Sequence, residues 1–135
     1  MVADTPPLDR NALKGSRVLV VDDDADAREL CSSALALYGA TVTSAASATA
    51  ALAVVDAAAP DVVVSDISMP DHDGYWLVDQ LHQRGLRVPV VAMTAFGRQH
   101  SRQAAFAAGF GEYLSKPFDP LNLCDVIARV IAARA

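Results

Sequence analysis

Three aspartates that follow two short apolar runs are the residues of this chain best suited to chemistry. Asp22 and Asp23 come directly after residues 18–21, and Asp66 comes directly after residues 62–65. At about 5 Å separation and an effective dielectric of about 20, each pair of like charges costs about 3 kcal/mol. Such a cluster needs a proton or a cation, and a hard divalent ion with oxygen ligands, such as Mg²⁺, suits it best.

The elements that must position these acids follow from hydrophobic patterning. Both runs are continuous and β-branched, which is typical of strands in a parallel sheet covered on both faces. From Arg17 onward the pattern predicts strands over 18–21, 41–45, 62–65, 88–93 and 112–115. Between and after them it predicts helices near 25–38, 47–58, 75–84, 98–108 and 119–133. Ser47 and Asp73 are the expected N-caps of the second and third helices, and Gly39 is the expected stop of the first. In that first helix, the expected buried stripe is Leu30, Ala34, Leu37 and Tyr38.

Alternating strands and helices with short connections predict an α/β fold. Right-handed crossovers then give a doubly wound sheet of five parallel strands, (βα)5, with the flavodoxin-like order 2-1-3-4-5. The first and third strands are neighbours in this order, so Asp22, Asp23 and Asp66 converge where such sheets bind ligands. The fourth and fifth strands bring Thr94 and Lys116 to the same rim.

This set of side chains suits phosphoryl transfer, which needs an anionic nucleophile, a metal and donors for the phosphoryl oxygens. Asp66 is the candidate nucleophile and would form an aspartyl phosphate, while Asp22 and Asp23 hold the metal. Lys116 and Thr94 are candidate donors. A simpler interpretation, that the acids near residue 22 only cap the first helix, explains one or two of them, Asp24 and Asp26, but not an acid on another strand.

Four motifs at consecutive strand ends resemble the receiver domain of bacterial two-component response regulators. They are the sequences at 20–24 (VVDDD), 65–70 (SDISMP) with 73–74 (DG), 94–95 (TA) and 116–118 (KPF). The resemblance runs in order from about residue 17 to residue 134. It implies that Asp66 is the phosphorylated aspartate and that Asp23, Asp66 and the backbone carbonyl of Ser68 bind Mg²⁺ directly, with Asp22 acting largely through water.

The resemblance also implies a conformational switch. Thr94 would be the hydroxyl that moves toward the phosphoryl group, and Tyr113 the aromatic side chain that turns inward with it. Lys116 would bridge phosphate and carboxylate, and the bond before Pro117 would be cis. The surface expected to change is formed by the segments near 98–108, 112–115 and 119–133. The chain is expected to be a monomer, or a weak homodimer that associates through this surface.

The function implied is that of a phosphoacceptor signalling domain. A histidine kinase or histidine phosphotransfer protein would supply the phosphoryl group, and an unidentified downstream protein would read the result. The domain would not be an enzyme in the ordinary sense, although it catalyses its own phosphorylation and dephosphorylation. The alternative is a pseudo-receiver, an interaction module independent of phosphorylation, but such modules usually lack a pocket residue that is present here.

Composition narrows the remaining classes. The 135 residues carry a net charge of −5 without a basic cluster, which argues against direct contact with nucleic acid. No apolar stretch approaches the ~18 residues of a membrane span, and a cytoplasmic location is expected. Residues 1–16 are predicted to be a tail or linker and residues 17–135 the receiver domain, with residues 13–16 and 108–110 resembling receivers attached to hybrid histidine kinases.

Other chemical classes fit the residues less well. A flavin or dinucleotide site would need a phosphate cradle where the chain has acids at 22–24, and an aspartate-based hydrolase would need a substrate cap. Cys31 and Cys124 are expected to be small buried hydrophobes rather than a redox pair.

Overall fold

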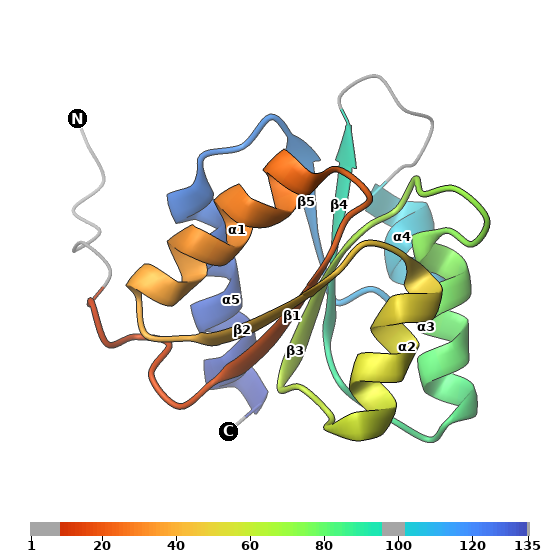
Figure 1. Ribbon diagram of the computed structural model, residues 1–135, viewed down its shortest axis with the longest axis horizontal. Coiled ribbons are helices and arrows are strands. Elements are labelled where there is room, and N and C mark those ends of the chain that lie inside the picture. Colours follow the sequence, from red (N-terminus) through yellow and green to blue (C-terminus); the bar gives the residue numbers. More distant parts are fainter. Residues whose placement is uncertain (1–8, 96–101, 135) are drawn as a thin grey trace.

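A parallel five-stranded sheet with helices on both faces forms the core of the chain (Figure 1). The computed structural model describes residues 9–95 and 102–134. The strands are β1 (Arg17–Val21), β2 (Thr41–Ala45), β3 (Val62–Asp66), β4 (Val90–Ala95) and β5 (Glu112–Lys116). The helices are α1 (Ala25–Leu37), α2 (Ala48–Ala57), α3 (Gly74–Gln83), α4 (Arg102–Ala108) and α5 (Pro120–Arg134). The strand order is β2-β1-β3-β4-β5, so the predicted doubly wound α/β fold is confirmed.

The two faces of the sheet are covered by different helices. Helices α1 and α5 lie on one face, and α2, α3 and α4 lie on the other (Figure 1). Successive β1 side chains point to opposite faces, so Val18 and Val20 join the cluster under α1 and α5, and Leu19 and Val21 join the other cluster. All four are at most 1% exposed, which explains why the strand reads as a continuous apolar run.

Strand β4 differs from the prediction by two residues at each end. It was expected over 88–93 and spans Val90–Ala95. Pro89 has no N–H for the ladder, and Ala95 still pairs with Lys116 of β5. Thr94 therefore lies inside the strand. The beginning of the helix predicted near 98–108 lies outside the described residues, and its described part is α4.

The buried stripe predicted for α1 is wrong in part. Leu30 and Leu37 are 57% and 53% exposed, whereas Cys31 and Leu35 are buried. Both sets recur at helical spacing, so the sequence pattern did not separate them, and packing on the sheet and α5 selected the second. Tyr38 is buried as expected.

The three predicted helix-terminus signals are confirmed. The side chains of Ser47 and Asp73 accept hydrogen bonds from backbone N–H groups in the first turns of α2 and α3, at 3.0 and 2.9 Å. Gly39 follows α1 with a φ of +102°, a conformation that L side chains rarely adopt.

Residues 9–16, predicted as part of a tail or linker, pack against the rest of the fold. The N–H of Leu13 donates to the carbonyl of Tyr38 at 2.9 Å, and the N–H of Thr41 donates to the carbonyl of Ser16 at 2.9 Å. The Leu13 side chain is 0% exposed and belongs to the core cluster under α1 and α5. These residues are therefore not a free tail, while the predicted division of the chain after residue 16 stays a prediction.

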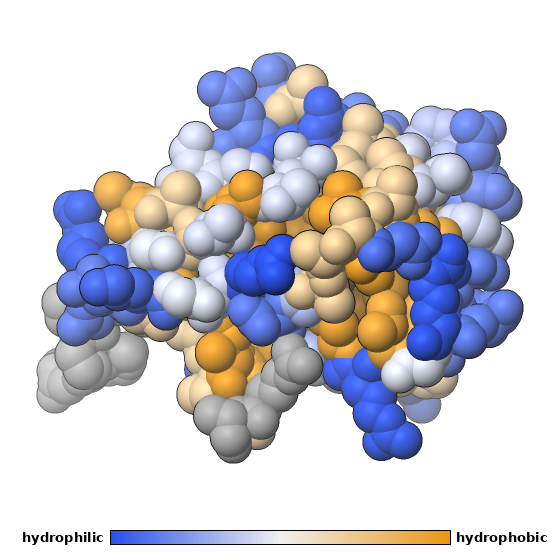
Figure 2. Space-filling model, turned by 60° about the horizontal axis from the view of Figure 1, so that its bottom comes forward, coloured by the Kyte–Doolittle hydropathy of each residue, from blue (hydrophilic) through white to orange (hydrophobic). Residues whose placement is uncertain are grey.

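The edge of the sheet where the strands begin lies away from the three aspartates. Hydrophobic side chains reach the surface there between hydrophilic ones (Figure 2). A hollow of about 460 Å³ lies there, and the residues that line it include Arg87 before β4, Glu112 of β5 and Arg129 of α5.

None of the described helices is both long enough and apolar enough to cross a membrane.

Candidate functional site

Strands β1 and β3 end side by side and bring their acids together. Val21 pairs with Ser65 in the parallel register, so Asp22 and Asp66 follow at the same level of the sheet. The structure places one carboxylate oxygen each of Asp22, Asp23 and Asp66 within 4.8 Å of one another. Asp22 and Asp66 are 1% and 8% exposed, whereas Asp23 is exposed. Two of the three charges are thus largely removed from water.

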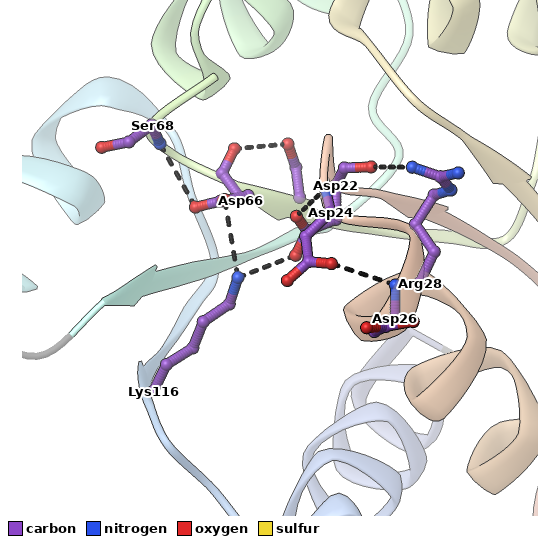
Figure 3. Close-up of polar contacts among 8 residues, drawn as sticks. Asp22, Asp24, Asp26, Arg28, Asp66, Ser68 and Lys116 are labelled. Atoms are coloured by element: carbon purple, nitrogen blue, oxygen red, sulfur yellow. Dashed lines mark hydrogen bonds and ion pairs between the residues drawn. The ribbon is translucent and has the colours of Figure 1, made fainter. Parts of the chain in front are cut away.

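Lys116, at the end of β5, supplies a positive charge to this cluster. Its Nζ lies 2.7 Å from Oδ2 of Asp22 and 3.5 Å from Oδ2 of Asp66 (Figure 3). The bond between Lys116 and Pro117 is cis, as the resemblance implies. One ammonium facing three carboxylates leaves the cluster with excess negative charge, which a divalent cation would relieve.

Burial and the neighbouring charges shift the titration of this cluster. Burial raises the pKa of Asp66, and the negative charge of Asp22 adds to this, while the Lys116 ammonium and the Ser68 N–H act in the opposite direction. Burial alone would lower the pKa of Lys116, but its hydrogen bond to Asp22 and the charges of Asp66 and Asp22 outweigh burial and raise that pKa. Lys116 therefore stays protonated at neutral pH, and Asp66 resists ionisation more than an exposed aspartate does.

The backbone around Asp66 is held from two sides. The N–H of Ile67 donates to the carbonyl of Met93 at 2.9 Å, and the N–H of Gly74 donates to the carbonyl of Ile67 at 2.8 Å. A Cβ on Gly74 would lie 2.8 Å from the Asp66 carbonyl oxygen, so only glycine allows α3 to begin this close to β3. The N–H of Ser68 donates to Oδ1 of Asp66 at 3.2 Å (Figure 3).

Thr94 places a buried hydroxyl at the same end of the sheet. It is 2% exposed, and its Oγ1 has no hydrogen-bond partner among residues 9–95 and 102–134. A buried polar atom without a partner is uncommon, and this hydroxyl can therefore still accept or donate a hydrogen bond.

Tyr113 lies on β5 and is half-buried. The guanidinium carbon of Arg102, on α4, lies 5.4 Å from the centre of the Tyr113 ring and 5.9 Å from the centre of the Phe106 ring. The ring of Tyr113 thus connects β5 with the first turn of α4. Its role as a switch stays a prediction.

The turn between β1 and α1 carries more acids than a helix cap needs. Asp24 is the N-cap, since its Oδ1 accepts from the Asp26 N–H at 3.0 Å, and Asp26 lies in the first turn of α1. The Asp24 N–H in turn donates to Oδ1 of Asp22 at 2.9 Å. Capping therefore accounts for Asp24 and Asp26, but not for the cluster around Asp66.

Arg28 makes a contact with Asp22 that the sequence analysis did not predict. Its Nη1 donates to the backbone carbonyl of Asp22 at 2.8 Å (Figure 3). The available signal was its position four residues after the cap Asp24, on the first turn of α1. Cys31 and Cys124 are free and buried, as predicted, and burial raises the pKa of both thiols to about 11.

The donor set fits a hard divalent cation. Carboxylate oxygens within 4.8 Å of one another are the ligands that Mg²⁺ prefers, and soft sulfur or imidazole ligands are absent from the described cluster. The cluster that could hold such an ion consists of Asp22, Asp23 and Asp66, and the N–H of Ser68 contacts Asp66.

The order of the sheet and the acidic cluster where β1 and β3 end define a flavodoxin-like receiver fold. The sequence profile described as the response regulator receiver domain matches residues 18–128. The chain belongs to this family, and it is a signalling domain of two-component systems.

Relatives and solved structures agree with this assignment. The chain is 41% identical to an uncharacterised 14.6 kDa protein of Leptolyngbya boryana, over 86% of this chain and 90% of that protein. It is 39% identical to the response regulator protein FleR of Pseudomonas aeruginosa, over 84% of this chain but only 24% of FleR. A crystal structure of a putative response regulator from Chloroflexus aurantiacus superposes with a TM-score of 0.82 at 34% identity, covering 88% of this chain and 99% of that one.

Proposed function

We propose that this domain accepts a phosphoryl group on Asp66 from a phosphohistidine of a histidine kinase or histidine phosphotransfer protein. The observation that carries the proposal is the arrangement at the sheet edge. Three carboxylates lie within 4.8 Å of one another, an ammonium lies 2.7 Å from one of them, and a buried hydroxyl in β4 has no described partner. Phosphoryl transfer needs a nucleophile, compensating positive charge and donors for the phosphoryl oxygens, and these groups supply them.

In the proposed reaction a carboxylate oxygen of Asp66 forms the new bond to phosphorus. The phosphorus–nitrogen bond of the phosphohistidine breaks, and the imidazole leaves with the electron pair and takes up a proton. The N–H of Ser68 and the ammonium of Lys116 already contact Asp66 and would donate to the transferred phosphoryl oxygens. Mg²⁺, held by Asp23, Asp66 and the Ser68 carbonyl with Asp22 acting through water, would supply positive charge that offsets the carboxylates and the phosphoryl group.

The same residues support a switch. An acyl phosphate on Asp66 would give the Thr94 hydroxyl an acceptor, and its movement would free space toward which Tyr113 turns. Arg102 links that ring to α4, so the surface of α4, β5 and α5 would change with it. A downstream protein that binds one form of this surface would then read the phosphorylation state. Hydrolysis of the acyl phosphate by water, assisted by the same site, would return the domain to its first state.

The test is incorporation of a phosphoryl group from acetyl phosphate, followed on phosphate-affinity gels with and without Mg²⁺. Wild-type protein should be modified only with Mg²⁺, Asp66→Asn should not be modified, and Asp71→Asn should behave as wild type. Asp71 is a suitable control because it is an exposed acid in the same loop, and asparagine tolerates its φ of 69°. A wild type that is not modified, or an Asp66→Asn variant modified equally, would refute the proposal. The first result would favour the phosphorylation-independent module.

A further inference from the structure

Arg28 is a cation of the site region that the proposed reaction does not use. It lies on the first turn of α1 and is half-buried. Among the described residues, no carboxylate forms an ion pair with it within 4.0 Å, although four acids precede it within six residues: Asp22, Asp23, Asp24 and Asp26. Its Nη1 instead donates to the main-chain carbonyl of Asp22 at 2.8 Å.

This contact closes the acidic turn on itself. The backbone N–H of Arg28 donates to the carbonyl of Asp24 at 3.0 Å, so one residue holds the turn at two points. The Asp22 side chain is itself held by the Lys116 ammonium and by the Asp24 N–H. Asp23 lies between these fixed points, and its carboxylate faces those of Asp22 and Asp66.

The positive charge of Arg28 and its hydrogen bond both stabilise the acidic turn. Four acids within five residues repel one another, and a guanidinium bonded to their backbone opposes the opening of the turn. Arginine suits this role because its guanidinium donates from a rigid plane and stays charged at all relevant pH values.

From these contacts we propose that Arg28 is a positioning residue for the metal site. It acts through the Asp22 carbonyl and keeps the Asp23 carboxylate turned toward Asp66 before Mg²⁺ binds. This inference rests on the proposed function for its purpose, but its geometry is a property of the metal-free turn.

The test compares Arg28→Gln and Arg28→Lys with Arg84→Gln. The control changes the net charge equally and breaks only exposed side-chain contacts of Arg84, with Asp56 and Gln80. Calorimetry should show Mg²⁺ affinity reduced about 10-fold or more in Arg28→Gln, as for other residues that orient metal ligands. Arg28→Lys should recover a substantial part of the loss, and Arg84→Gln should stay within about two-fold of wild type. Hydrogen exchange of the metal-free protein should show faster exchange of the Asp24 N–H in Arg28→Gln only.

Each outcome decides the role of Arg28. Equal Mg²⁺ affinity in Arg28→Gln and wild type, or an equal loss in Arg84→Gln, would overturn the proposal, and so would a wild type that binds no Mg²⁺. Should Arg28→Gln fail to fold, the Mg²⁺ affinities of Arg28→Lys and Arg84→Gln are compared instead. A lower affinity in Arg28→Lys supports the proposal, because lysine keeps the charge but not the planar donor, and equal affinities overturn it. If the wild type binds Mg²⁺ with the expected pattern but takes up no phosphoryl group, the proposed function fails and the role of Arg28 stands.

Discussion

Replacing Lys116 with methionine should destabilise the metal-free protein strongly, because it leaves buried carboxylates without a counter-charge. The Nζ atom lies 2.7 Å from an Asp22 oxygen and 3.5 Å from an Asp66 oxygen. At an effective dielectric of about 20 these contacts are attractive by about 6 and about 5 kcal/mol, most of which is offset by the desolvation of the charges. Asp22 is 1% exposed and Lys116 is 26% exposed at the side chain. Removing one partner of such a pair costs about 3–5 kcal/mol, and we expect about 3 kcal/mol here.

The assay is urea unfolding in EDTA at neutral pH, with Lys14→Met as the control. Lys14 is exposed, so its replacement changes the net charge equally without uncovering a buried acid. We expect Lys116→Met to lose about 3 kcal/mol, or roughly 10 °C in Tm, and Lys14→Met to lose less than about 0.5 kcal/mol. The double variant Asp22→Asn/Lys116→Met should be more stable than Lys116→Met, because a neutral amide replaces the unpaired buried charge.

The dependence of this loss on pH and Mg²⁺ identifies its cause. Burial raises the pKa of Asp66 in the folded protein above its ordinary value of 3.8, and removing Lys116 takes away a contribution that lowers it. The cost of ionised Asp66 is therefore full at neutral pH and is lost as the pH falls through its folded pKa. Mg²⁺ should stabilise Lys116→Met more than wild type, since it replaces the missing positive charge. A loss below about 1 kcal/mol in EDTA, or one independent of pH and Mg²⁺, would refute the electrostatic argument.

Three further predictions concern the fold and the acid of the site. Leu13→Ala should lower the free energy of unfolding by about 2–5 kcal/mol in urea, because the side chain is 0% exposed. Leu37→Ala is the control: the side chain is 53% exposed, and the change should stay within about 0.5 kcal/mol. Equal effects of the two substitutions would contradict the docking of residues 9–16. Gly39→Ala should cost about 1–2 kcal/mol, since its φ is +102° and its Cβ would lie 3.0 Å from the Lys14 backbone. Gly85→Ala should cost less, with a φ of +73° and nothing within 4 Å; the reverse order of losses would argue against the clash. In metal-free buffer at pH 7, Asp66→Asn should be more stable than wild type, because burial raises the pKa of Asp66 and its ionised form is disfavoured in the fold. This advantage should shrink in urea titrations as the pH falls toward 3.8, and a less stable variant at pH 7 would show that the Lys116 contact outweighs burial.

The order of the elements and the positions of the acids could be predicted from the sequence alone. Continuous apolar runs at 18–21 and 62–65 indicate strands buried on both faces, and this pattern can be recognised within each run alone. Once the strands are parallel and alternate with helices, few sheet orders remain, and the acids after β1 and β3 must meet. Helix ends could also be predicted, because capping side chains such as those of Ser47 and Asp73 accept hydrogen bonds from backbone N–H groups only three residues further along the chain.

Features that depend on residues distant along the chain could be found only in the folded structure. Leu30 and Leu37 repeat with helical spacing as well as Cys31 and Leu35 do, and only the position of α1 on the sheet decided which pair is buried. Leu13 could not be assigned to the core from its own segment, because its burial depends on residues that lie on several other elements.

At the site, the sequence placed charges at strand ends, but distances between side chains follow only from packing. Lys116 reaches Asp22 across 94 residues of sequence, and the Arg28 guanidinium bonds a main-chain carbonyl among four nearby acids. A sequence pattern shows which groups share an edge of the sheet. Which of them touch depends on side-chain conformations that the folded core selects, because the cost of burying each charge depends on its partners.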